Sequence, residues 1–373
     1  MSITIKEVTT KKELNAFLNL PYRLYKGHKY YVPPLKFDEK ATLDKNKNPA
    51  FEFCEAAYWL AYKNNKVVGR IAGIINNAYI DKWQNKYARF GWIDFEEDEA
   101  IATALLQQVE TWAKSKGMTA VHGPLGFTDL DHEGLLIEGY DQLSTMATLF
   151  SYPYYKKFIE NNGYQKDTDW VEYKIKIPKQ LPEGLIKIAS IVERRYNLHV
   201  IKAKKPKEIL PYAKPIFDLI NNAYAHLYGV TELTAKQIDY YTKAYFGFMK
   251  TDFVSLVVDK DNNLVAFGIT MPSLSHALQK CNGSLLPFGF IHLLTALSKP
   301  KVADFLMVAV RKDLQGKGVN AIFIREIGKA YIQRGIEFAE TNIELEDNTK
   351  VQTIWKHFDA TQHKRRRCYI KHL

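Results

Sequence analysis

The chain of 373 residues is long enough for two domains of ordinary size, and its hydrophobic content of 46% can fill a core in each, which excludes a disordered chain. The formal charge of +11 favours anionic partners such as phosphates, nucleic acid or an acidic lipid surface. Three scattered cysteines are too few for a disulfide framework or a clustered metal site. We therefore predict no metal site and a reducing, cytoplasmic location.

Charged residues interrupt the N-terminus before an apolar core can form, so we expect no signal peptide. The longest apolar stretch, residues 285–297, contains Pro287, Gly289 and His292. It is shorter than the ~20 residues that a membrane-spanning helix requires. We therefore predict no transmembrane segment.

The first half begins with strand-like sequence and then predicts a β-hairpin, with strands at 56–62 and 67–75 joined by a polar turn. A strand at 89–95 and a helix at 99–116 follow. The helix carries apolar residues at spacings of three and four, among them Ile101, Leu105 and Val109. This pattern predicts a helix that packs one face on a sheet.

Residues 174–184 end a strand pattern and bring two prolines and a glycine close together, which predicts a boundary between domains 1–178 and 184–373. The second half repeats the order of the first: a hairpin at 253–258 and 264–271, then a strand at 304–310 and a helix at 319–334. The chain thus looks like a structural duplication. Strands alternating with helices predict an α/β or α+β sheet protein rather than a bundle or a sandwich.

The strongest motif follows the strand predicted at 304–310. An apolar run at 305–310 leads into a turn containing Gly316 and Gly318, and a helical pattern begins directly afterwards. Glycines let the backbone approach a ligand, and the free N–H groups of a first helical turn suit a phosphate. Arg311, Lys312 and Lys317 add positive charge. An ordinary helix cap with basic flanks would give the same pattern.

Residues 307–320 resemble motif A of the GCN5-related N-acetyltransferases, which reads Gln or Arg, two further residues, Gly, one residue, and then Gly or Ala. Gln315, Gly316, Gly318 and Val319 fit that pattern, whereas Asn320 departs from it. Residues 338–342 resemble the family's next strand, and residues 348–355 follow the spacing of its motif B helix. Residues 367–371 resemble its closing strand.

The resemblance implies tandem acyl-CoA N-acyltransferase-like domains, each a mixed, mostly antiparallel sheet flanked by helices. The whole chain also looks like a large branch of two-domain bacterial proteins of this fold, many of them uncharacterised, that carry segments like 33–35 and 123–125 here. In the family two neighbouring strands splay apart. The pantetheine arm lies in the gap and bonds to the first strand as an added strand would.

The implied cofactor is acetyl-CoA or another acyl-CoA, with its pyrophosphate on the turn and the thioester carbonyl polarised by backbone N–H groups near Val308. The implied binding residues are Met307, Val308, Val310, Gln315, Gly316, Lys317, Gly318, Val319, Asn320 and Asn348. In the first half the corresponding turn, residues 94–99, carries five carboxylates that would repel a pyrophosphate. We infer a degenerate N-terminal copy and one cofactor site per chain.

Acyl transfer to an amine with a pKa near ~10.4 is helped by a base at neutral pH. Glu340 is the first candidate for this base and Glu344 the second, although both also fit a solvated acidic edge. Many relatives place a tyrosine in motif B as the acid, where this chain has Trp355. Tyr369 is therefore our candidate acid, with His357 as a substitute, while a thiol of pKa ~8.5 can leave without one.

Two other clusters carry less weight. The acidic residues of the 129–141 stretch match no metal spacing and indicate an ordered polar loop. The basic run 363–367 indicates a charged loop that leads into an edge strand.

The leading hypothesis is an acyltransferase that acts on the amine of a small metabolite or amino-acid derivative. Two alternatives stay open: a non-catalytic coenzyme A-binding or regulatory protein, and an aminoacyl-tRNA-dependent transferase of the same fold. Nucleic acid is otherwise not expected as a partner. The sequence does not indicate an oligomeric state.

Overall fold

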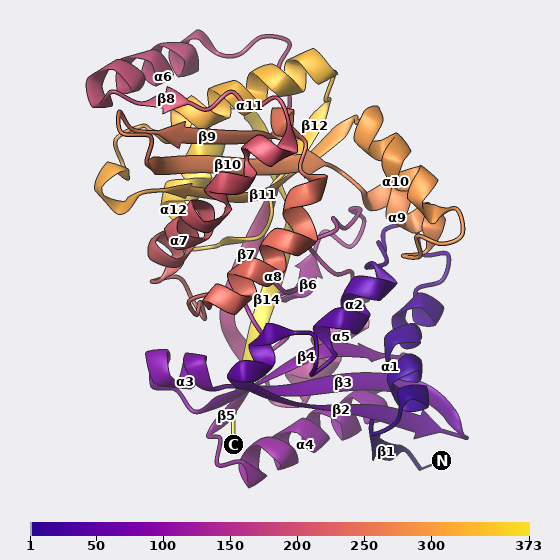
Figure 1. Cartoon of the computed structure of the whole chain (residues 1–373). Helices are drawn as coiled ribbons and strands as arrows, with labels where there is room; N and C mark the ends of the chain where they lie inside the picture. The colour runs from indigo at the N-terminus through magenta and orange to yellow at the C-terminus, as the bar shows by residue number, and fades with distance from the viewer. Residues whose placement is uncertain (1) are drawn as a thin grey trace. The chain divides into compact units, whose positions relative to one another are not determined.

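The computed structural model describes residues 2–373, apart from the side chain of Phe248, and separates into two compact units (Figure 1). The first unit comprises Met1–Val171, Leu274–Leu293 and His363–Leu373. The second comprises Glu172–Ser273 and Leu294–Gln362. This division differs from the continuous ranges 1–178 and 184–373 expected from the sequence.

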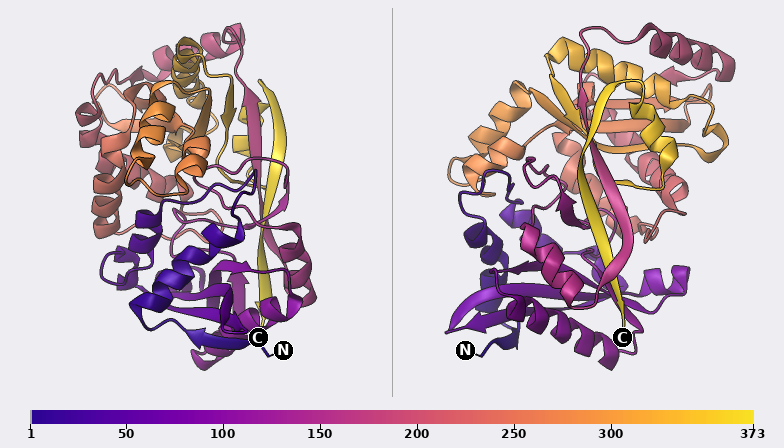
Figure 2. Two further views of the ribbon diagram at one scale, coloured as in Figure 1. Left: turned by 90° about the vertical axis from the view of Figure 1, so that its right-hand side faces the viewer. Right: turned by 180° about the vertical axis from the view of Figure 1, so that it is seen from behind.

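Two features of the chain account for the difference. β7 (Gln165–Lys176) and β14 (Asp359–His372) are long strands that each continue from one unit into the other (Figure 2). The segment 274–293 comes from the second half of the sequence but packs within the first unit. There the Gln279 side-chain amide donates to the carbonyl oxygens of Lys29 and Tyr31, each at 2.9 Å.

The sheet of the first unit has the order β1-β2-β3-β4-β5-β14, and β6 also pairs with β14. The pairs are antiparallel except for β4 with β5, which are parallel. The predicted hairpin is confirmed as β2 and β3. The remaining bounds are β1 (Thr4–Glu7), β2 (Cys54–Lys63), β3 (Lys66–Asn76), β4 (Tyr87–Phe95), β5 (Ala120–Gly123) and β6 (Leu135–Glu138).

The helix predicted at 99–116 is α4 (Glu99–Ser115), and its apolar stripe is buried in the core of the first unit. Asp98 caps this helix by accepting a hydrogen bond from the backbone N–H of Ala100. The other helices of this unit are α1 (Lys11–Leu24), α2 (Lys36–Thr42), η1 (Pro49–Glu52), α3 (Asn77–Trp83), α5 (Pro153–Asn161) and α9 (Ser275–Cys281). α10 (Gly289–Ser298) begins in this unit and ends in the second.

The sheet of the second unit has the order β7-β12-β11-β10-β9-β8, with β13 beside β7. Only β11 and β12 are parallel among the pairs whose register is described. The second predicted hairpin is confirmed as β9 and β10, and the late strand as β11. The bounds are β8 (His199–Val200), β9 (Val254–Val258), β10 (Leu264–Pro272), β11 (Val302–Val310), β12 (Phe338–Glu340) and β13 (Glu344–Leu345).

The helix predicted at 319–334 is α11 (Asn320–Arg334), which packs on α6 and on the sheet of the second unit. The remaining helices are α6 (Glu183–Tyr196), η2 (Pro206–Glu208), η3 (Leu210–Tyr212), α7 (Ala213–Tyr224), α8 (Ala235–Tyr245), η4 (Phe246–Phe248), η5 (Thr251–Phe253), η6 (Lys312–Leu314) and α12 (Thr349–Trp355). Each unit is thus a mixed, mostly antiparallel sheet flanked by helices, as predicted. Within residues 2–373, no helix has the length and apolar content needed to cross a bilayer.

The expectation of a charged loop at 363–367 was wrong, because these residues lie inside β14, which has neighbours on both sides. Their charges are matched by buried acceptors. Arg365 and Arg367 both donate to Asp169 of β7, at distances of 2.8 to 3.2 Å. Lys364 donates to the carbonyl oxygen of Leu143 at 3.1 Å. Paired and hydrogen-bonded in this way, cationic side chains can occupy a sheet interior.

Candidate functional site

Two neighbouring strands of the second unit separate part-way along their length. β11 pairs with β12 only as far as Asp304, which faces Glu340, the last residue of β12. Beyond Glu340 the chain follows β7 instead, since the Thr341 N–H donates to the Tyr173 carbonyl oxygen at 2.9 Å. Residues 306–310 of β11 therefore have an edge that no strand of the described chain covers.

The backbone groups of Val308 and Val310 point toward this open edge. The Arg311 N–H donates to the Val265 carbonyl oxygen of β10 at 2.8 Å, and every second residue of an antiparallel pair bonds in this way. Val308 and Val310 alternate with those residues and face the other side. Accordingly, the Val308 carbonyl oxygen accepts a hydrogen bond of 2.7 Å from the Tyr224 hydroxyl. Both N–H groups can serve a ligand that adds to the edge as a strand does.

The backbone of the turn that follows β11 is accessible to the close approach of a ligand. Gly316 and Gly318 have φ angles of 72° and 79°, in the left-handed region that favours glycine. The side chain of Gln315 donates to the carbonyl oxygen of Val310 at 3.1 Å, which fixes the start of the turn. Among the described residues, the backbone N–H groups of Gly316, Gly318, Val319 and Asn320 have no protein acceptor. Such a group of N–H donors at the start of a helix binds phosphate.

The charges around the turn are not all available to a ligand. Arg311 donates to Asp313 at 2.7 Å and lies 3.4 Å from Asp259, so its charge is largely matched within the protein. Lys312 and Lys317 are exposed, and the Lys317 ammonium lies over the Tyr196 ring at 5.6 Å from its centroid. The positive field for an anion thus comes from these two lysines and from the N-terminus of α11.

A carboxyl group with an unusual pKa lies in the same unit. Glu344, on β13, accepts a hydrogen bond of 2.7 Å from the indole N–H of Trp355, while its Oε2 is buried and has no hydrogen-bond partner. Burial raises the pKa of Glu344 to about 7, against the lowering effect of the indole. Burial also raises the pKa of Tyr224 to about 12, and Glu344 is close enough to add to that increase. Glu344, Tyr224 and the open edge of β11 therefore lie close together.

Most of the cofactor residues expected from the sequence follow the open edge and the turn. Met307 pairs with Ile269, so its backbone groups face β10 rather than the edge. Asn348 is the N-cap residue of α12, where its side chain makes no capping bond. The residues on the edge and the turn are Val308, Val310, Gln315, Gly316, Lys317, Gly318, Val319 and Asn320.

The predicted catalytic residues are dispersed. Glu340 lies on β12, in register with Asp304. Tyr369 belongs to the first unit, where it is buried and donates to Glu160 at 3.0 Å, and burial raises its pKa. His357 is exposed in the turn after α12. The structure gathers Glu344, Trp355 and Tyr224 instead, and Tyr224 was missed because it ends an apolar helix and carries no motif of its own.

The chain is similar to known proteins over its full length. No family model matches it. It is 26% identical to "Protein YghO" of Escherichia coli (strain K12), over 99% of this chain and 95% of that protein. It is 24% identical to a bacterial ceramide synthase of Caulobacter vibrioides, over 100% of this chain and 98% of that protein.

Among solved structures, a tandem GNAT protein from the clavulanic acid biosynthesis pathway aligns with a TM-score of 0.55 and 13% identity, covering 100% of this chain and 98% of that chain. The chain has the tandem fold of the GCN5-related N-acetyltransferases. The resemblance expected from residues 307–320 is thus confirmed at the level of the fold. In the second unit, the separated β11 and β12 and the turn before α11 have the arrangement that this resemblance implied.

In the first unit of this tandem fold β4 also extends past its parallel partner, because β5 pairs with it only at residues 87–89, but protein groups occupy the edge. The Leu125 N–H donates to the Phe90 carbonyl oxygen at 2.9 Å, and the Phe95 N–H donates to the buried Tyr155 hydroxyl at 2.9 Å. The cavity that remains beside β4 has a volume of only about 40 Å³. Asp94 is paired with Arg70 at 2.7 Å, and the Asp98 carboxylate caps the start of α4. A carboxylate thus occupies the helix N-terminus that would otherwise bind a phosphate.

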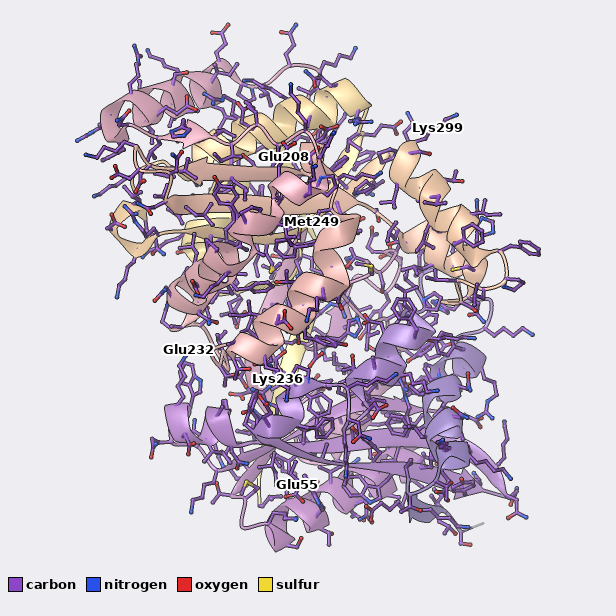
Figure 3. All side chains as sticks on the ribbon, in the orientation of Figure 1. Glu55, Glu208, Glu232, Lys236, Met249 and Lys299 are labelled. Atoms are coloured by element: carbon purple, nitrogen blue, oxygen red, sulfur yellow. The ribbon has the colours of Figure 1, made fainter. Side chains whose placement is uncertain are left out.

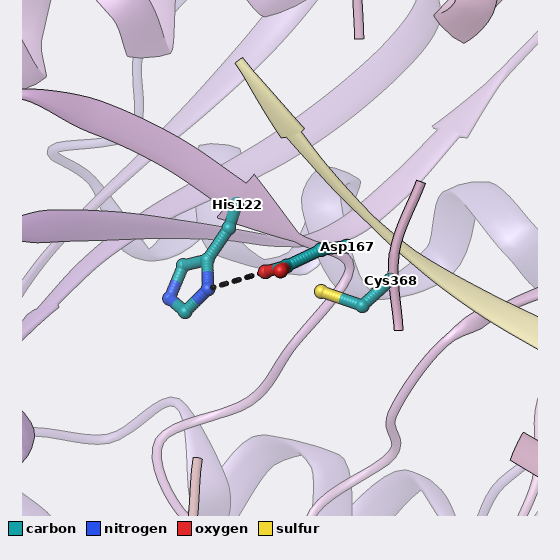
Figure 4. Close-up of side chains that lie close together, drawn as sticks. All are labelled: His122, Asp167 and Cys368. Atoms are coloured by element: carbon teal, nitrogen blue, oxygen red, sulfur yellow. Dashed lines mark ion pairs between the residues drawn. The ribbon is translucent and has the colours of Figure 1, made fainter. Parts of the chain in front are cut away.

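A second group of ligand-type side chains lies in the first unit (Figure 4). His122, Asp167 and Cys368 come from β5, β7 and β14, and their donor atoms lie within 4.8 Å of one another. His122 Nδ1 is 3.7 Å from the Asp167 carboxylate. Burial lowers the pKa of His122, the Asp167 carboxylate opposes this, and the nearby Arg89 guanidinium adds to the lowering. That guanidinium also disfavours a cation, so we interpret the group as a buried polar cluster and keep the absence of a metal site as a prediction.

Proposed function

We propose that this protein transfers an acyl group from coenzyme A to an amine, and that the second unit carries the site. The observation that supports this most strongly is the open edge at Val308 and Val310, which continues directly into the glycine turn and the N-terminus of α11. These backbone groups suit a pantetheine arm and a pyrophosphate in succession. Acetyl-CoA or a longer acyl-CoA would serve as the donor.

The residues of this site supply positioning, polarisation and a base. When bound, acyl-coenzyme A brings an activated thioester. In this proposal the Val308 N–H donates to the carbonyl oxygen, where charge develops as the amine attacks. Glu344 takes the proton that the amine nitrogen loses as the C–N bond forms and the C–S bond breaks. A base with a pKa of about 7 is half ionised at neutral pH, which suits this role.

Glu344 thus replaces Glu340 as the first candidate for the base. Glu340 is the carboxylate that the sequence favours, but Glu344 has the raised pKa, the buried oxygen and the fixed orientation. Trp355 occupies the position of the family's tyrosine and orients this base instead of acting as an acid. The thiolate leaving group is weakly basic enough to leave without a protein acid.

Two classes of acceptor are proposed. The first is the amine of a small metabolite or amino-acid derivative. The second is the amine of a long-chain lipid base, which is favoured by the full-length similarity to a bacterial ceramide synthase. In both cases the acceptor nitrogen must reach the neighbourhood of Glu344.

The test is turnover of a panel of amines by the purified protein. Short and long acyl-CoA donors are combined with amino acids and with a long-chain amino alcohol, and thiol release and product mass are followed. Glu344→Gln should lower kcat by about a hundredfold or more, the usual contribution of a general base, while coenzyme A binding is retained. The exposed Glu337→Gln serves as the control. Full activity in Glu344→Gln would refute the base, and binding without any turnover would favour the non-catalytic alternative.

A further inference from the structure

The apolar segment 285–297 is exposed, and the proposed function makes no use of it. Leu286, Phe288 and Leu294 are 79%, 70% and 59% exposed, and Phe290 and Ile291 are also largely accessible. None of the ten residues of α10 is buried, and none is charged. Apart from His292, Thr295 and Ser298 the helix is apolar, and an exposed apolar surface of this kind is normally covered by protein or by lipid. Something outside the described chain is therefore expected to cover α10.

The residues that precede the apolar segment, and the start of α10, are held in place by hydrogen bonds. α9 is tied to the first unit by the two bonds of the Gln279 amide, and the Lys36 N–H donates to the Gly283 carbonyl oxygen at 2.9 Å. Gly283 has a φ of 67°, and a Cβ there would lie 2.1 Å from the Pro34 oxygen. The Phe290 N–H donates to Leu285 at 2.9 Å, which fixes the start of α10. The exposed side chains are thus presented by a defined loop and helix.

The charged residues that flank the apolar segment in the sequence have one sign. No acidic residue occurs between Asp261 and Asp304 in the sequence. The segment is flanked by Lys280 at the end of α9 and by Lys299 just beyond α10, and both are exposed. Figure 3 labels Lys299 at the end of this helix. A large apolar surface bordered by cations complements an anionic bilayer surface, where apolar groups enter the acyl boundary and lysines meet the headgroups.

We propose that the apolar segment docks this protein on an anionic lipid bilayer. α10 has ten residues and a length of about 15 Å, half of what a spanning helix needs, so it lies in the interface and does not cross. The inference rests on exposure and charge and is independent of the proposed acyl transfer. A second copy of the chain is a poorer occupant, because flanking lysines of both copies would meet across a two-fold interface.

The test is co-sedimentation of the full chain with vesicles made of equal parts phosphatidylcholine and phosphatidylglycerol. The triple variant Leu286→Ser, Phe288→Ser, Phe290→Ser should lower the partition coefficient by about tenfold or more, because burying even one large apolar side chain is worth about that factor. The matched control changes Ile186, Ile191 and Leu210 to serine, which are exposed by 41%, 44% and 50%. It should bind as the unchanged protein does.

Further measurements distinguish binding of the apolar segment to a lipid surface from its burial against another protein. Lys280→Glu with Lys299→Glu should weaken binding, as should replacing phosphatidylglycerol by phosphatidylcholine. Phe288→Trp should show blue-shifted fluorescence when anionic vesicles are added. The proposal is overturned if the protein does not sediment with anionic vesicles at low salt, or if the triple variant binds like the control. It is also overturned if sedimentation velocity shows a dimer that the triple variant abolishes while vesicle binding is absent.

Discussion

Replacing Trp355 by phenylalanine isolates the hydrogen bond that the indole makes to Glu344. The ring of Trp355 is buried and packs against Phe305, with centroids 5.2 Å apart, and phenylalanine preserves most of this contact. The variant removes the N–H that donates to the Glu344 carboxylate at 2.7 Å. That donor favours the ionised form, so its loss raises the pKa of Glu344 further above about 7.

The size of the shift follows from the strength of the bond. A hydrogen bond to a charged acceptor contributes about 1.5–3 kcal/mol, which corresponds to about one to two pKa units. Relaxation and water entry would offset part of this in a partly buried site, so we expect a shift of about one unit. Because the base acts when ionised, the acidic limb of log kcat/KM against pH should move to higher pH by that amount.

The assay is the pH dependence of thiol release with an amine identified from the panel. At a pH well below 7, Trp355→Phe should be about tenfold slower than the unchanged protein, and the two rates should converge at high pH. Glu344→Gln should lack this limb altogether. An acidic limb that stays in place or moves to lower pH in Trp355→Phe would refute the assignment of Glu344 as the base.

Three further predictions concern the same contacts and the fold. Tyr224→Phe removes the bond to the Val308 carbonyl oxygen and should lower kcat/KM by about two- to tenfold, the value of one hydrogen bond, in steady-state kinetics. Because the pKa of Glu344 is raised from 4.5 to about 7, its contribution to the free energy of unfolding is full at low pH and declines as pH rises toward 7. Urea denaturation should show up to about 3 kcal/mol of this decline, and Glu344→Gln should lack it. Asp169→Asn should cost about 3–5 kcal/mol in the same assay, whereas Glu138→Gln, an exposed partner of the same arginine, should cost less than about 1 kcal/mol; equal costs would contradict the account.

The elements that the sequence predicted correctly are those whose signals are local. The two hairpins are apolar runs joined by polar turns, and α4 and α11 carry apolar side chains at spacings of three and four. The turn at Gly316 and Gly318 was found because consecutive residues carry all of its features. The tandem fold followed from the order of these elements in the two halves.

The remaining features depend on contacts between distant parts of the chain. The partly buried position of Arg365 and Arg367 within β14 depends on Asp169, a residue of another strand that no pattern near them indicates. The raised pKa of Glu344 requires burial and the indole of Trp355, neither of which is visible in its neighbours. The segment 274–293 packs with the first unit through Gln279, although it interrupts the sequence of the second.

The central claim is that each chain has one coenzyme A site, at the glycine turn of the second unit, and calorimetric titration with coenzyme A tests it most directly. Gly316→Asp places a negative charge at the turn, whereas the matched Gly335→Asp places it at the opposite end of α11. The two glycines have φ angles of 72° and 65°, and neither has an atom within 4 Å of an added Cβ. We predict one site per chain in the unchanged protein and in Gly335→Asp, and no measurable binding in Gly316→Asp. Two sites per chain, or unchanged binding in Gly316→Asp, would contradict the account.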